Sequence, residues 1–412
     1  MKIVDVQVCS LNPPKAKEEG VRPWREPWTR TFREASPRDK YDPPLVRYEP
    51  GGQYFVKVIG EDGTWGLGSG DTARTASVII DEALAPQILG QDVGAIDTCN
   101  DRMWRGCLSF GLEGLTARAV AGVDLALWDL WGKVTNQPVY RLAGGNARQS
   151  MDCYVTGNDV DWGLACGFRK FKLARPHGVE TGQAGIEGTV ELIAKTREQI
   201  GQDADLMLDC WMAYDVDYAV QMCEALRPYR MRWMEEMLIP HDWEGNRAIR
   251  KRVPWQSIAS GEHWTTRYPA IRAVNEGLVD LIQADLTWIG GFTEAMRVAH
   301  YADARGIQMC LHTGVNDLYG QHFTAVMPNT PLIEFYQGTL PGVPLEDCYL
   351  GAPTERGRTC YRTTPGTPIP VDGKIGLPPG PGFGLQVPEE WLVPYDGKIV
   401  ETGRHFVQKS EK

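Results

Sequence analysis

Three features are scarce in this sequence, and each scarcity excludes a class of protein. Basic residues are not in excess: 43 Lys and Arg against 53 Asp and Glu give a formal net charge of -10. That balance argues against nucleic acid or an anionic membrane as the main partner. Long apolar runs are missing as well, since the best candidate, AVAGVDLALWDLW, contains two aspartates.

Paired cysteines are also missing. The ten cysteines are scattered and form no CxxC motif, so free thiols are expected rather than disulfides or a zinc site. The first residues, MKIVDVQVCS, alternate like a strand and do not resemble a signal peptide. A cytoplasmic protein is therefore expected.

Chain length and periodicity predict two domains and a tail. Residues 1–140 combine strand patterns, a Pro- and Arg-rich loop at about 12–50, and helical periodicity from about 75. GLGSGD (66–71) lacks GxGxxG spacing, so a hairpin is a better interpretation than a dinucleotide loop. Residues 141–345 alternate short apolar runs with helical runs, which predicts a closed (β/α) barrel. Residues 346–412 are expected to pack back on the first domain.

One predicted barrel strand carries a cluster of cations. FRKFKLARP (168–176) contains Lys170 and Lys172, which project from the same face because side chains alternate along a strand. Two ammonium groups at such a short distance repel each other, so each lowers the pKa of the other. The pair therefore predicts a lysine whose pKa is depressed.

Later strands each end in a polar residue, at intervals of 23 to 27 residues: Asp209, Glu235, Glu262, Asp285 and His312. Residues at the carboxyl ends of barrel strands converge on the face that holds the active site in barrel enzymes. Three carboxylates that meet there need a cation to stay ionised. Carboxylate oxygens favour a hard divalent ion, so Asp209, Glu235 and Glu262 are predicted to bind Mg²⁺.

These motifs resemble those of a known family. LDCWM, WMEE, SGEH, DLIQADLTWIGGFTEA and the strand-terminal His312 are similar to the mandelate racemase subgroup of the enolase superfamily. Within it, they look closest to L-rhamnonate dehydratases and similar acid-sugar dehydratases. The resemblance implies a (β/α)7β modified TIM barrel with an N-terminal α+β capping domain, Mg²⁺, and homo-oligomers. It also implies that Glu235 binds the metal while Glu236 points away.

The chemistry of this family removes a weakly acidic proton alpha to a carboxylate, with a Lys or His base and Mg²⁺. His312, oriented by Asp285, is the first candidate base. Lys172, next to Lys170, is a second base or an electrostatic partner of the enediolate. Glu334 matches the glutamate that donates a hydrogen bond to the substrate carboxylate, for which it must be protonated.

Substrate contacts are expected from the loop at 12–50, where Arg22 and Arg47 are candidates, and from His263 at the pocket edge. The predicted reaction converts an aldonate such as L-rhamnonate or L-lyxonate to a 2-keto-3-deoxy sugar acid. Two lysines on one strand depart from the L-rhamnonate dehydratase pattern, so a 2-hydroxy-acid racemase or epimerase remains an alternative. A non-catalytic sugar-acid-binding regulator is a further alternative.

Overall fold

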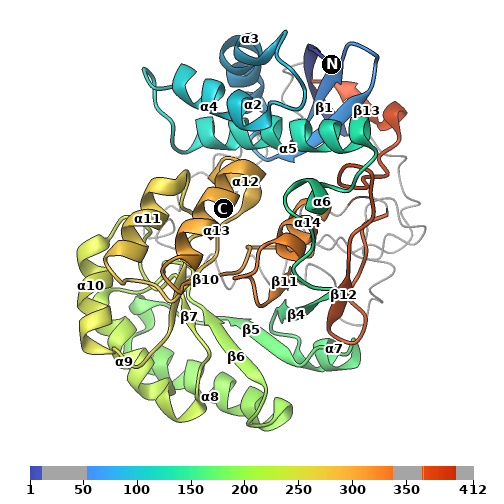
Figure 1. The fold of residues 1–412 in the computed structure, drawn as a ribbon. Helices are drawn as coiled ribbons and strands as arrows, with labels where there is room; N and C mark the ends of the chain where they lie inside the picture. Colours follow the sequence, from blue (N-terminus) through green and yellow to red (C-terminus); the bar gives the residue numbers. More distant parts are fainter. Residues whose placement is uncertain (12–52, 337–363, 365, 396–412) are drawn as a thin grey trace, which may run out of the picture.

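The computed structural model describes residues 1–11, 53–336, 364 and 366–395. These residues form a barrel domain beneath a smaller domain in which long helix α5 lies along an antiparallel sheet (Figure 1). None of the helices in this described part combines the length and apolar composition needed to cross a bilayer.

The smaller domain is built on a four-stranded sheet in the order β13-β1-β2-β3. A hairpin is present, with β2 and β3 paired antiparallel, but its turn lies at Gly60–Gly63 and GLGSGD (66–71) lies mostly on strand β3. The strands of this sheet are β1 (Ile3–Leu11), β2 (Tyr54–Gly60), β3 (Trp65–Gly70) and β13 (Leu392–Pro394). Its helices are α2 (Ala73–Ile79), the π-helix η2 (Ile80–Leu84), α3 (Ala85–Ile88), α4 (Ile96–Gly106) and α5 (Leu115–Thr135).

Glycines on β3 allow α5 to approach the sheet closely. A Cβ atom on Gly66 would lie 2.1 Å from the carbonyl oxygen of Ala126, and one on Gly68 would lie 1.9 Å from that of Gly122. No side chain fits at these distances, so the GLG sequence serves helix–sheet packing. This packing fixes the end of β3, where the chain turns toward the barrel.

Eight parallel strands form the barrel sheet, in the order β10-β9-β8-β7-β6-β5-β4-β11. They are β4 (Ser150–Thr156), β5 (Lys170–Ala174), β6 (Asp205–Asp209), β7 (Met234–Glu235), β8 (Ile258–Ser260), β9 (Leu281–Ile282), β10 (Gln308–Met309) and β11 (Ile333–Tyr336). The segment that leads into β11 lies beside β10, because Met309 N donates to Asn329 O (2.9 Å), four residues before β11 begins. The predicted (β/α)7β barrel with a capping domain is therefore confirmed.

Helices follow each of the first seven barrel strands, as the alternating pattern predicted. They are α7 (Val160–Ala165), α8 (Gly182–Ile200), α9 (Val216–Leu226), α10 (Trp243–Arg252), α11 (Arg267–Asn275), α12 (Leu286–Ile289), α13 (Phe292–Asp303) and α14 (Leu318–Val326), with α6 (Val139–Leu142) before β4. Short 3-10 turns are η3 (Val179–Thr181), η4 (Arg227–Tyr229) and η6 (Glu389–Trp391).

The inner face of the barrel is apolar at its centre and polar at one end. A buried cluster fills the centre: Tyr154, Met207, Trp233, Ala259, Leu281, Cys310 and Leu332. Along β5, Lys172 pairs in register with Met207 of this layer, and Ala174 pairs with Asp209 one layer higher. The polar strand ends therefore begin directly above the apolar layer.

The described part of the C-terminal segment contacts both domains. β13 pairs with β1 of the capping sheet, and β12 (Lys374–Gly376) pairs antiparallel with β4 of the barrel. Buried Asp129 on α5 joins three segments, because it accepts hydrogen bonds from Leu67 N and Phe383 N (both 2.8 Å) and pairs with Lys133.

Candidate active site

His312 and Asp285 form a pair at the carboxyl ends of neighbouring strands. Nδ1 of His312 lies 2.9 Å from Oδ2 of Asp285. The other carboxylate oxygen of Asp285 accepts from the backbone N–H of Thr287 (2.8 Å) and from its hydroxyl (2.7 Å), so α12 fixes the orientation of the carboxylate. The predicted pairing of these two residues is thus present.

The second ring nitrogen of His312 faces the carboxylates. Nε2 lies 3.8 Å from Oε2 of Glu262. Burial alone would lower the pKa of His312, but the negative charges of Glu262 and Asp285 outweigh burial and raise it to about 10. These carboxylates favour the imidazolium as long as no cation offsets their charge, and Nε2 faces them across the barrel mouth.

Asp209, Glu235 and Glu262 are buried at three successive strand ends. Asp209 and Glu235 are register partners on β6 and β7. Burial, together with the nearby carboxylates, raises the pKa of Asp209 to about 7 and that of Glu235 to about 8, although Lys172 opposes the shift. The pKa of Glu262 is raised too, chiefly by burial. So much buried acidic charge favours a bound cation.

Lys172 lies beneath these carboxylates, fully buried. Its Nζ is 2.5 Å from Oε1 of Glu235, 2.8 Å from Oε1 of Glu334 and 3.7 Å from Oδ2 of Asp209. Burial would lower its pKa, but these carboxylates raise it well above the usual lysine value. The prediction of a depressed lysine pKa is therefore wrong in direction.

Lys170 shares the face of Lys172 but not its surroundings. It begins β5 at the opposite end of the barrel, where its Nζ lies 3.2 Å from Asp152. Residues two apart on a strand are separated by about 6.6 Å along it, which removes Lys170 from the mouth. The predicted influence of Lys170 on Lys172 is absent for this reason.

Glu334, on β11, is surrounded by donors. It accepts from the backbone N–H of Thr313 (2.6 Å), from the hydroxyl of Thr156 and from Lys172. Burial opposes ionisation, but Lys172 and His312 outweigh it and lower the pKa of Glu334. The sequence hypothesis required a protonated Glu334, whereas these contacts favour the carboxylate.

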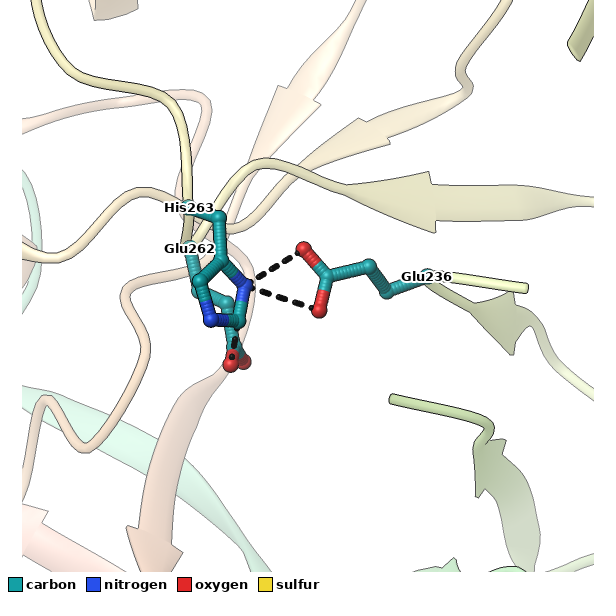
Figure 2. A group of neighbouring side chains, drawn as sticks. All are labelled: Glu236, Glu262 and His263. Carbon is teal, nitrogen blue, oxygen red and sulfur yellow. Dashed lines mark hydrogen bonds and ion pairs between the residues drawn. The ribbon is translucent and has the colours of Figure 1, made fainter. Parts of the chain in front are cut away.

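Glu236 turns into the mouth rather than away from it (Figure 2). β7 ends at Glu235, and Glu236 adopts φ +43°, so strand alternation stops there. Its oxygens lie 2.8 and 2.9 Å from Nδ1 of His263. Within the described residues, Glu236, Glu262 and His263 are the group of three ligand-type side chains gathered within 4.8 Å. The prediction that Glu236 points away is therefore wrong.

His263 lies at the rim, with 17% of its side chain exposed. Its ring lies 6.4 Å from that of Trp211 and 5.5 Å from that of Trp288, and Trp288 in turn lies 5.3 Å from His312. Reasoning from the sequence missed both tryptophans, although each follows a polar strand end by two or three residues. Arg22 and Arg47 lie outside the described residues.

Comparisons with known proteins agree with this geometry. The family model of the enolase C-terminal domain-like proteins matches residues 161–391, and that of the mandelate racemase / muconate lactonizing enzyme N-terminal domain matches residues 52–144. The chain belongs to the enolase superfamily, in its mandelate racemase subgroup.

Two relatives in this superfamily illustrate the similarity. An L-rhamnonate dehydratase of Saccharopolyspora erythraea is 35% identical over 84% of this chain and 86% of its own. The crystal structure of L-rhamnonate dehydratase from Gibberella zeae has a TM-score of 0.80 at 28% identity, covering 95% of this chain and 96% of that one. A second crystal structure of the Gibberella zeae enzyme is a complex with Mg, at 27% identity, the same coverage and the same TM-score.

Proposed function

We propose that this enolase-superfamily protein dehydrates a sugar acid, an aldonate such as L-rhamnonate or L-lyxonate, to a 2-keto-3-deoxy sugar acid with the help of Mg²⁺. The observation that carries the proposal is the His312–Asp285 pair, in which Nε2 of His312 faces a cluster of buried carboxylates. The similarity to L-rhamnonate dehydratases over most of the chain supports the substrate class.

The chemistry of the donors fits a hard divalent cation. Asp209, Glu235 and Glu262 offer only oxygen, at three successive strand ends, and burial raises the pKa of each despite the nearby Lys172. Glu236 also lies close to Glu262 and pairs with His263. The choice of Glu235 over Glu236 rests on the family resemblance and on the position of Glu235 at the end of β7, in register with Asp209. We therefore assign the metal to Asp209, Glu235 and Glu262. When bound, the cation would supply positive charge to the enediolate that forms at the substrate carboxylate.

Residues of this chain would then catalyse two steps, the removal of the C2 proton and the departure of the C3 hydroxyl. A cation beside the carboxylates would weaken their effect on His312 and lower its pKa, so the neutral imidazole would accept the C2 proton through Nε2. Asp285 would hold the other ring nitrogen and stabilise the imidazolium that forms. The same imidazolium then protonates the C3 hydroxyl, which leaves as water. The resulting enol tautomerises to the 2-keto acid, so the net change is loss of one water molecule. Lys172 would balance negative charge from below, since it forms ion pairs with Glu235, Glu334 and Asp209.

The residues of β5 that face the inside of the barrel favour elimination over racemisation. Racemisation by two bases requires a proton acceptor on each face of C2. Lys172 is buried beneath three carboxylates, and the next inward position, level with Asp209, is Ala174. β5 therefore offers no accessible base opposite His312, which argues against the racemase alternative.

A library screen tests the proposal. The purified protein, with MgCl2, is incubated with a set of aldonates and other acid sugars, and 2-keto acid formation is measured. We expect conversion of at least one six- or five-carbon aldonate, abolished by EDTA. Exchange or inversion at C2 without keto-acid formation would indicate a racemase or epimerase. Ligands that raise the melting temperature without any conversion would indicate a non-catalytic binding protein.

A further inference from the structure

Trp288 lies between the two histidines of the barrel mouth. It belongs to α12, three residues after Asp285, and is partly exposed. Its ring centroid is 5.3 Å from that of His312, at an interplanar angle of 43°, and 5.5 Å from that of His263, at 48°. Asp285 and Trp288 therefore reach His312 from the same short helix, one at a ring nitrogen and the other at the ring itself.

Two groups of the capping domain hold the indole. Its N–H donates to Oδ2 of Asp71 at 3.1 Å, and the guanidinium carbon of Arg118 lies 4.2 Å from the ring centroid. Arg118 also forms an ion pair with the same oxygen of Asp71. Asp71 follows β3 and Arg118 is on α5, so both partners come from outside the barrel.

We propose that Trp288 is a positioning residue for His312, and that the capping domain sets its position through Asp71 and Arg118. Asp285 fixes Nδ1 of His312 but leaves the ring free to rock about that hydrogen bond. Trp288 limits this rocking only while its indole is held, which makes the alignment of Nε2 depend on the docked capping domain. The inference rests on the proposed role of His312 in proton transfer.

Other contacts dock the capping domain independently of Asp71. On α5, Trp128 Nε1 donates to Oγ1 of Thr293 (2.9 Å), and buried Asp124 accepts from the backbone N–H of Thr293 (3.0 Å). A change at Asp71 should therefore release the indole without releasing the domain. This separation makes the link to Trp288 testable apart from overall stability.

The test uses three substitutions of the full-length, Mg²⁺-loaded protein. Trp288→Phe keeps an aromatic ring but removes the N–H donor, and Asp71→Ala removes the acceptor. We expect each to lower kcat about 10- to 100-fold with KM within about 3-fold, because a small misplacement of a catalytic group has effects of that size. Asp71→Asn should recover most of the loss, since its amide oxygen can still accept from the indole.

Trp104→Phe is the matched control. Trp104 packs near Tyr268 of the barrel, with ring centroids 6.2 Å apart, but its buried indole N–H has no hydrogen-bond partner among the residues that the structure describes. The same substitution there should leave kcat unchanged. Asp71→Ala should add no further loss to Trp288→Phe, because the two act through one contact.

Several results would overturn the inference. One is an unchanged kcat in Trp288→Phe. Another is a rise in KM without a fall in kcat in Trp288→Phe, which would indicate that Trp288 contacts the substrate. A third is a loss of kcat in Trp104→Phe equal to that in Trp288→Phe. If the wild-type protein converts no sugar acid, the proposed function fails instead. A crystal structure of Asp71→Ala still decides the link in that case, since an indole that has not moved contradicts it.

Discussion

Replacing His312 with Asn tests the assignment of the base in the most direct way. β5 offers no substitute acceptor opposite His312, because Lys172 forms ion pairs with Glu235 and Glu334 and position 174 is alanine. Each proton transfer to or from a positioned side chain contributes about 10²- to 10⁴-fold, and His312 is assigned two. We therefore expect kcat to fall by at least about 10³-fold, which corresponds to about 4 kcal/mol of transition-state stabilisation.

The assay measures the rate of 2-keto acid formation from the sugar acid that the screen identifies. Mg²⁺ binding, measured by calorimetry, should remain, because His312 is not among the assigned ligands. His300→Asn, on the exposed face of α13, is the matched control and should retain full activity. A His312→Asn protein that dehydrates its substrate within about 10-fold of the wild-type rate would refute the reasoning.

Three further predictions follow from the charges around the site. Asp285→Asn should lower kcat about 10- to 100-fold, because a neutral partner reduces the basicity of the imidazole; steady-state kinetics check this, and an unchanged rate counts against the pairing. Glu235→Gln should weaken Mg²⁺ binding in calorimetry more than Glu236→Gln does; the reverse order would place the metal beside His263. The folded-state pKa values of Asp209 (about 7) and Glu235 (about 8) lie above the value near 4 of an unfolded carboxyl. The stability that these two groups add to the metal-free fold is therefore complete below about pH 4, falls as the pH rises, and is lost once the pH passes 7 to 8. Scanning fluorimetry in EDTA should show the melting temperature falling between pH 5 and pH 8.5, with the rise caused by MgCl2 largest at the high end; a Mg²⁺ effect independent of pH would contradict the metal assignment.

Much of the site could be predicted from spacing along the chain. Polar residues one βα unit apart must converge at one end of a closed barrel, so the pairing of Asp285 with His312 followed from the order of strands. The barrel and the β2–β3 hairpin were predictable for a similar reason, because both depend on local periodicity and turn residues.

Height within the barrel and local chain reversals could not be predicted in this way. A period of two assigns Lys170 and Lys172 to one face but does not say which layer each occupies. Glu236 was misassigned because β7 stops after two residues and a positive φ reverses the alternation. The ionisation of Glu334 depends on donors from three other strands or strand ends, which no local pattern contains.

The contact between Asp71 and Trp288 joins residues 217 positions apart and has no sequence motif. It depends on the packing of the capping domain on the barrel, to which α5 contributes through its contacts with Thr293. Roles assigned to single residues, a cytoplasmic location and a homo-oligomeric state stay predictions.

Proton NMR of the reaction in D2O tests the central claim most directly. The account predicts that a sugar acid incubated with the protein and MgCl2 loses its C2–H signal only as a 2-keto-3-deoxy product appears, with solvent deuterium at C3 of that product. Deuterium entering C2 of recovered or epimerised sugar acid, with no keto acid formed, would contradict it.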